Sequence, residues 1–321
     1  MISQSDSVSF PRSQVGVPLA FIGGFRSGST LLINLLGLHP GITAWFETKF
    51  LSEALRWLRV LSGHSDLARE VALSSPSHPA GFGLEPVTAR MYAQMVADDA
   101  RLRGTSPSGK RDYERYPLGA DRIHYSLSDA LEALDRWRSM LHGSETAATV
   151  ACAVSELYRS LGDRHLAAEP AEMLVNKTPE LPRFGAELRE TVGPHKMILL
   201  VRDGRDVVRS AAALDWGEPS YIAALWRDLI LQSRDAAQGA SRDYLEVRFE
   251  DLVSRSRLVL DRVCDFLDIP RQGPEILKAY QDLVGRPIGA GIPAIPVEND
   301  LAAKVTVRDA GDLLADLGYI S

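Results

Sequence analysis

A glycine-rich turn near the N-terminus is the part of the sequence best suited to chemistry. The segment Pro18–Leu36 reads PLAFIGGFRSGSTLLINLL, so a short apolar run is followed by three glycines and then by strong helix formers. Such a turn directs backbone N–H groups toward the start of a helix, where an anionic group is stabilised. We therefore expect a phosphate-bearing ligand at this turn. The candidate binding residues are Arg26, Ser27, Gly28, Ser29 and Thr30.

The loop differs from the loop of nucleoside triphosphate-binding enzymes. Gly23 and Gly28 have the spacing of the G-x-x-x-x-G-K-[ST] pattern, but Ser29 stands where the lysine should be, and the cation is Arg26. A kinase or an ATPase needs that lysine and a metal to neutralise the γ-phosphoryl group. The sequence therefore favours a ligand whose transferred group carries less charge than a γ-phosphoryl group. A small-molecule kinase with a degenerate loop is the alternative.

Composition fits a soluble globular protein and argues against several other classes. The chain has 321 residues, of which 45% are hydrophobic and 24% charged, and its net charge of −6 provides no basic field for nucleic acid. It has no run of 18 apolar residues that would predict a membrane span, and Met1–Gln14 lacks the apolar core of a signal peptide. We expect a cytoplasmic protein in which Cys152 and Cys264 are reduced. A homodimer is one possible oligomeric state.

Short apolar runs predict a parallel sheet with helices between its strands. Each run is followed by a turn and a helical pattern, which is typical of βαβ units. The predicted strands are Leu19–Ile22, Met173–Val175, Met197–Val201 and Tyr244–Val247. In such sheets ligands bind beyond the carboxyl ends of the strands, where Lys177, Arg202 and Arg248 follow. We predict one α/β domain over 1–321, with a P-loop NTPase-like three-layer fold.

The long segment between the first two predicted strands has its own helical patterns. Leucines recur at helical spacing in several stretches of it, so we predict a helical cap over 52–170 that binds the acceptor. Within the cap, Arg101–Arg122 is basic and rich in turn residues. This stretch is either a solvated loop or a lid that grips an anionic acceptor. After Pro287–Pro296, which predicts an extended loop, a last helix is expected over Ala310–Leu317.

A second motif, taken with the glycine-rich loop, resembles a known family. Met197–Ser210 reads MILLVRDGRDVVRS, and the two motifs together resemble the sulfotransferases that use 3′-phosphoadenosine 5′-phosphosulfate (PAPS). The resemblance implies that the first loop holds the 5′-phosphosulfate and that Arg202 and Ser210 hold the 3′-phosphate. The later segments Tyr244–Leu252 (YLEVRFEDL) and Leu314–Tyr319 (LADLGY) also resemble this family. A planar, bidentate arginine suits a phosphate, and no metal is expected, since the sulfuryl group bears a single charge.

The resemblance also implies the residues that carry out the transfer. Lys177, in the segment VNKTP, and Arg26 would stabilise charge on the departing oxygen and on the sulfuryl group. Pro179 stands where many cytosolic members have a histidine base, whereas tyrosyl-protein sulfotransferases use a glutamate after His-Pro. We therefore predict Glu47 as the general base, in a site lined by Trp45 and Phe46 that raises its pKa. His78 and His124 are alternative bases, and Glu47 could instead only begin a helix.

Two departures from the family pattern leave parts of the site open. Leu31 stands where cytosolic members have a tryptophan that stacks on adenine, so Trp226 is either that platform or a core residue. The motif R-K-G-x-x-G is absent, and Lys304 or the stretch 285–293 would have to replace it. We expect transfer from PAPS to a hydroxyl or phenol of a small-molecule, glycoside or lipid acceptor. The alternatives are the kinase named above and a non-catalytic nucleotide-binding protein.

Overall fold

A computed structural model of the chain describes residues 17–65, 70, 81–102, 125–285, 287–288 and 300–320. The alternative bases His78 and His124 lie outside the described residues, as do nearly all of the basic segment Arg101–Arg122 and of the loop Pro287–Pro296. None of the helices within these ranges is long and apolar enough to cross a membrane.

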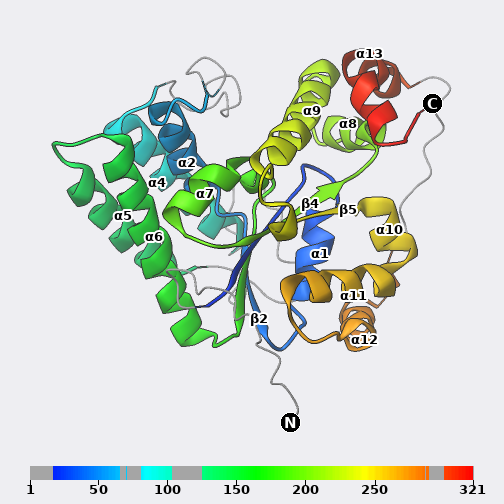
Figure 1. Cartoon of the computed structure of the whole chain (residues 1–321), viewed down its shortest axis with the longest axis horizontal. Helices are drawn as coiled ribbons and strands as arrows, with labels where there is room; N and C mark the ends of the chain where they lie inside the picture. Colours follow the sequence, from blue (N-terminus) through cyan, green and yellow to red (C-terminus); the bar gives the residue numbers. More distant parts are fainter. Residues whose placement is uncertain are drawn as a thin grey trace, which may run out of the picture.

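The core of the fold is a sheet of five parallel strands (Figure 1). Their order across the sheet is β2-β3-β1-β4-β5, and all the pairings are parallel. The strands are β1 (Leu19–Gly23), β2 (Ile42–Phe46), β3 (Met173–Lys177), β4 (Lys196–Val201) and β5 (Tyr244–Arg248). The four predicted strands are confirmed, and the sequence analysis missed β2, which forms one edge of the sheet.

One face of the sheet is covered by helices from both ends of the chain. Alternate residues of the strands, such as Ala20 and Ile22, share an apolar core with these helices, because successive side chains of a strand point to opposite faces. The helices on this face are α1 (Ser29–Leu36), α10 (Phe249–Ser254), α11 (Ser256–Leu267) and α12 (Gly273–Val284).

The other face carries the remaining layer. Phe21 and Trp45 of the sheet share one core with the helices that fall within the segment predicted as a cap, α2 (Lys49–Leu61), α4 (Leu84–Leu102), α5 (Leu127–Leu141) and α6 (Ala147–Ala168). These helices therefore pack against the face of the sheet, and the cap boundary at 52–170 stays a prediction. The layer is completed by η3 (Leu181–Phe184), α7 (Gly185–Thr191), α8 (Gly204–Ala212), α9 (Pro219–Ala236), η4 (Ser241–Asp243) and α13 (Leu301–Asp316). The predicted three-layer α/β fold is confirmed.

The last helix is longer than predicted. It begins after Asp300, whose carboxylate accepts hydrogen bonds from the backbone N–H groups of Ala302 and Ala303 as an N-cap. The helix is kinked at Ala310, where the backbone leaves helical geometry, and the prediction found only the part beyond this kink. The helix α13 packs against α8 and α9, on the same side of the sheet as both.

Strand register brings the candidate residues together at the carboxyl ends of the strands. Ile22 of β1 pairs with Lys177 of β3, and Phe46 of β2 pairs with the same lysine. All strands run in the same direction, so the turn after β1, the residue after β2 and the end of β3 meet at their carboxyl ends. Arg202 follows the carboxyl end of β4 and so lies on the same side.

Candidate active site

The glycine-rich loop is held by backbone conformations and contacts that need its glycines. Gly24 and Gly28 have φ values of 117° and 87°, in the region that favours glycine. A Cβ on Gly24 would lie 2.4 Å from the carbonyl oxygen of Leu200, and one on Gly28 would lie 2.3 Å from the ring of Phe249. The hydroxyl of Ser29 donates to the carbonyl of Gly24 and closes the loop at the start of α1. The loop is thus fixed before any ligand arrives.

A pocket of about 320 Å³ opens over this loop and collects most of the candidate residues. Ser27 and Ser210 lie beside it and do not line it. The predicted residues that line it are Arg26, Gly28, Ser29, Thr30, Glu47, Lys177 and Arg202. The pocket therefore joins residues from the turn after β1 and from the ends of β2, β3 and β4, which lie far apart in the sequence.

Glu47 and Lys177 form an ion pair at the end of β2 and β3. The Lys177 ammonium donates to the Glu47 carboxylate at 2.7 Å, and Lys49 approaches the other carboxylate oxygen at 3.2 Å. Lys177 is 1% exposed, and its ammonium lies 4.2 Å from the centre of the Phe46 ring. These two lysines stabilise the ionised carboxylate of Glu47, the form that accepts a proton.

A buried polar network holds this pair in place from behind. Glu47 has a φ of 53°, an uncommon conformation for a residue with a side chain, and its N–H donates to the carbonyl of Lys177 at 2.6 Å. The next N–H, of Thr48, donates to the hydroxyl of Thr178 at 2.9 Å, and Asn176 bonds to both threonine hydroxyls. These contacts fix the backbone that carries Glu47.

Arg202 lies at the opposite end of the pocket with few strong partners. Its guanidinium stacks on the ring of Phe249 at 4.5 Å and makes two long hydrogen bonds, each of 3.5 Å, to the carbonyl of Arg26 and to Asp206. Its Nε is buried and has no hydrogen-bond partner among the described residues. A half-buried guanidinium held this loosely is suited to an anion that completes its hydrogen bonds.

The side chain of Arg26 is directed to Ser210. Its Nε and Nη2 donate to the Ser210 hydroxyl at 3.0 and 2.8 Å, and its guanidinium lies 5.0 Å from the ring of Trp216. The structure therefore groups Arg26 with Ser210, the residue predicted to hold the 3′-phosphate, although its backbone belongs to the loop. The sequence analysis had grouped the Arg26 side chain with Lys177.

Two aromatic predictions differ from the structure. Trp45 is buried on the opposite face, against Tyr158 and His165, because Phe46 takes the side of β2 that contacts Lys177. It does not line the site, so the environment expected to raise the pKa of Glu47 is replaced by ion pairs with two lysines. Trp226 is also buried, and a Cβ on Gly204 would lie 2.7 Å from its ring, so it is a core residue and not an adenine platform.

The sequence analysis missed three aromatic residues outside the glycine-rich loop that line the pocket. Phe249 follows β5, Trp216 lies between α8 and α9, and Tyr280 belongs to α12. A search confined to polar residues after the strands passed over Phe249, although it stands directly after Arg248. Nothing in the local sequence marks Trp216 or Tyr280, because the fold alone brings them to the pocket. Lys304 is exposed on α13 and does not line the pocket.

Comparisons with known proteins show similarity to sulfotransferases. A model of the Sulfotransferase family matches residues 114–273. Protein-tyrosine sulfotransferase 2 of Gallus gallus is 26% identical over 171 residues, which are 48% of this chain. The match spans 45% of that relative's length, so less than half of it. The solved sulfotransferase domain of the Synechococcus PCC 7002 olefin synthase has the same fold, with a TM-score of 0.54, 18% identity and 99% coverage of both chains. By these comparisons the chain is similar to sulfotransferases over about half of its length.

Proposed function

We propose that this protein transfers a sulfuryl group from PAPS to a hydroxyl or phenol acceptor and releases 3′-phosphoadenosine 5′-phosphate (PAP). The observation that carries this proposal is one pocket that has an anion-binding loop at its base, a Glu47–Lys177 pair at one end and a loosely held Arg202 at the other. A ligand with two separate phosphate groups needs two such cationic ends. A nucleoside triphosphate carries its phosphates in a single chain.

The residues present fit such a ligand. The N–H groups at the start of α1 would bind the 5′-phosphosulfate, as helix N-termini bind anions. Arg202, whose buried Nε has no partner among the described residues, would bind the 3′-phosphate together with Ser210. The Arg26 guanidinium would support the same end through Ser210 and reach the 5′-phosphosulfate from the loop. The rings of Phe249, Trp216 and Tyr280 would enclose the adenosine.

In the transfer step, Glu47 and Lys177 take complementary roles. Glu47 accepts the proton from the acceptor hydroxyl as its oxygen forms a bond to sulfur, and the bond between sulfur and the bridging oxygen breaks. Lys177 stabilises the negative charge that develops on the departing oxygen. The ion pair at 2.7 Å keeps Glu47 ionised before the reaction and directs the ammonium of Lys177 toward the pocket. The charge of a buried lysine acts more strongly than it would in water, because less water screens it.

The acceptor is proposed by its chemistry alone. A single carboxylate base suits an alcohol or a phenol, since both carry a proton that must leave as the oxygen attacks. The relative from Gallus gallus is, by its name, a sulfotransferase of protein tyrosine. A tyrosine peptide therefore belongs in the acceptor screen beside small phenols, glycosides and lipid alcohols.

Ligand binding tests the proposal without an acceptor. We expect PAP to raise the melting temperature with or without Mg²⁺, and we expect ADP and ATP to raise it less. The screen for acceptors with labelled PAPS would follow. Stabilisation by ATP only in the presence of Mg²⁺ would overturn the proposal in favour of a kinase.

A further inference from the structure

The helix that follows Arg202 carries an acidic residue, Asp206, close to this arginine. Asp206 lies one turn after Arg202, and the shortest contact between the two side chains is a long one, 3.5 Å from Nη2 to Oδ2. Because the two side chains already lie this close, a small rotation would allow a close ion pair between them. A close pair would occupy the nitrogen atoms that a phosphate must reach.

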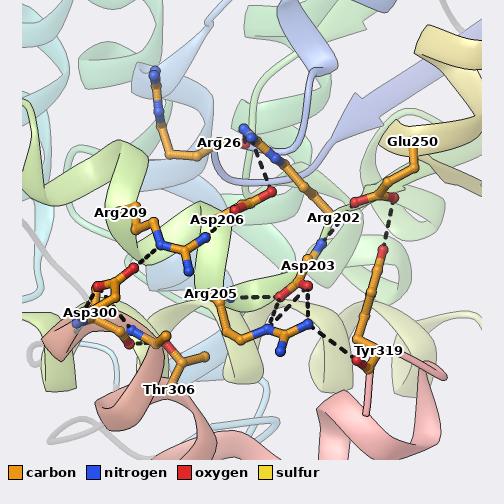
Figure 2. A network of polar contacts seen from close by, with 12 residues as sticks. Arg26, Arg202, Asp203, Arg205, Asp206, Arg209, Glu250, Asp300, Thr306 and Tyr319 are labelled. Carbon is orange, nitrogen blue, oxygen red and sulfur yellow. Dashed lines mark hydrogen bonds and ion pairs between the residues drawn. The ribbon is translucent and has the colours of Figure 1, made fainter. Parts of the chain in front are cut away.

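Arg209 holds Asp206 from the other side (Figure 2). Its Nη1 donates to Oδ1 of Asp206 at 2.5 Å, and its Nε bonds to the carboxylate of Asp300. Asp300 is the N-cap of α13, so this arginine connects α8 to the last helix of the chain. Burial opposes ionisation of Asp300, but the hydrogen bonds from Arg209 and from the N–H of Ala303 outweigh it and lower the pKa of this carboxyl.

The other end of α13 is also tied to the start of α8. Arg205 pairs with Asp203 at 2.6 Å and donates to the carbonyl of Tyr319, whose hydroxyl donates to Glu250. Glu250 in turn accepts from the backbone N–H of Asp203. The residues that flank the last helix, Asp300 before it and Tyr319 after it, therefore both contact the helix that begins two residues after Arg202 (Figure 2). This makes Arg209 part of a rigid bridge and not a loose surface residue.

We propose that Arg209, held by Asp300, sets the affinity for the 3′-phosphate by keeping Asp206 from forming a close ion pair with Arg202. Arg209 is thus a positioning residue that acts through Asp206, and Asp206 is the group that lowers affinity when it is released. This inference rests on the proposed function, because it assumes that Arg202 binds the 3′-phosphate.

The test is a double-mutant cycle on PAP binding, measured by calorimetry. In Arg209→Met, Asp206 is free to pair with Arg202, so PAP should bind about tenfold more weakly, the size of one charge-assisted hydrogen bond. In the double variant Arg209→Met/Asp206→Asn the competitor has lost its charge, so the affinity should return to within about twofold of Asp206→Asn alone. Adenosine 5′-monophosphate, which lacks the 3′-phosphate, should bind all these variants alike.

A matched control removes another arginine that ties α13 to a neighbouring helix. Arg227 of α9 pairs with Asp312 of α13 and does not line the pocket. Arg227→Met should therefore leave PAP affinity unchanged, although it also removes an ion pair that holds α13. Melting temperatures of both variants show whether each is folded.

The outcomes separate this inference from the proposed function. If the wild-type protein does not bind PAP, the proposed function fails. If it binds PAP and Arg209→Met weakens binding equally in the wild-type and Asp206→Asn backgrounds, then Arg209 acts directly on the phosphate and the inference is overturned. An equal loss in Arg227→Met would also overturn it, because the effect would then be one of helix packing.

Discussion

Replacing Glu47 by glutamine tests the step on which the proposed reaction depends. The amide has nearly the shape of the carboxylate and keeps an oxygen that accepts from Lys177, but it cannot accept the acceptor's proton at neutral pH. Loss of a general base costs about 10²- to 10⁴-fold in turnover. PAP binding should be kept or slightly tightened, because the change removes a negative charge from the pocket that we propose binds the anionic ligand.

The effect on stability should be much smaller than the effect on turnover. At 2.7 Å and an effective dielectric constant of ~20, the attraction between Glu47 and Lys177 is about 6 kcal/mol, most of which is offset by the cost of taking both charges out of water. The amide retains the hydrogen bond, so the free energy of unfolding should fall by about 1–3 kcal/mol. Against a typical total of about 5–15 kcal/mol, most of the protein stays folded.

Single-turnover transfer of labelled sulfate from PAPS to an acceptor found in the screen measures the chemical step directly. The matched control is Glu180→Gln, because Glu180 also carries a partly buried ion pair, to Arg56 at 3.5 Å, yet does not line the pocket. The control should keep wild-type turnover. Turnover of Glu47→Gln within about threefold of the wild type would refute the reasoning and move the base elsewhere.

Three further predictions concern binding, positioning and pH. Arg202→Met should weaken PAP binding by about 2–4 kcal/mol and leave adenosine 5′-monophosphate unaffected; equal effects on both ligands in calorimetry would contradict its assignment to the 3′-phosphate. Thr178→Val leaves the Thr48 N–H without its acceptor, so the free energy of unfolding should fall by about 1–3 kcal/mol. Turnover should fall more than the affinity for PAP. Thr178→Ser keeps the hydroxyl and should behave as the wild type. Burial lowers the pKa of His165 and His195 to about 4 each, so below the unfolded value of about 6.5 the unfolded chain binds more protons. Urea unfolding should therefore show a loss of about 2 kcal/mol per histidine between pH 7 and pH 5, and a profile with no such loss would show that these rings titrate normally.

The strands that the sequence predicted are those whose apolar runs are continuous. Segments such as Ile198–Val201 are buried on both faces in a parallel sheet, and this leaves a plain signal. The missed strand β2, with the sequence ITAWF, mixes a threonine and two aromatic residues just after His39 and Pro40, so it resembles a turn followed by a helix. The prediction of Glu47 rested on the family resemblance and not on knowledge that a strand precedes it.

The members of the candidate site were easier to predict than their pairings. Arg26, Lys177 and Arg202 each lie at or just after the carboxyl end of a predicted strand. Because the strands of the sheet are parallel, the sequence was enough to predict that these residues lie close together. Which side chains touch depends on rotamers and register that single-sequence patterns do not contain, as with Arg26, which bonds to Ser210 184 residues later. Recognition of β2 would have corrected the prediction that Trp45 and Phe46 both line the site, because neighbouring residues of a strand point to opposite faces of the sheet.

The geometry of the Glu47–Lys177 pair is encoded mainly by β3. This strand supplies Lys177, whose carbonyl accepts from the Glu47 N–H, and also Asn176 and the adjoining Thr178, which hold Thr48. The left-handed backbone at Glu47 costs about 1–2 kcal/mol, and these hydrogen bonds offset that cost. The proposed base and the proposed cation are therefore fixed by the same strand, and a shift of β3 would move both together. Their separation of 2.7 Å is thus a property of the sheet register, whereas the end proposed to bind the 3′-phosphate is built on α8 and braced by α13.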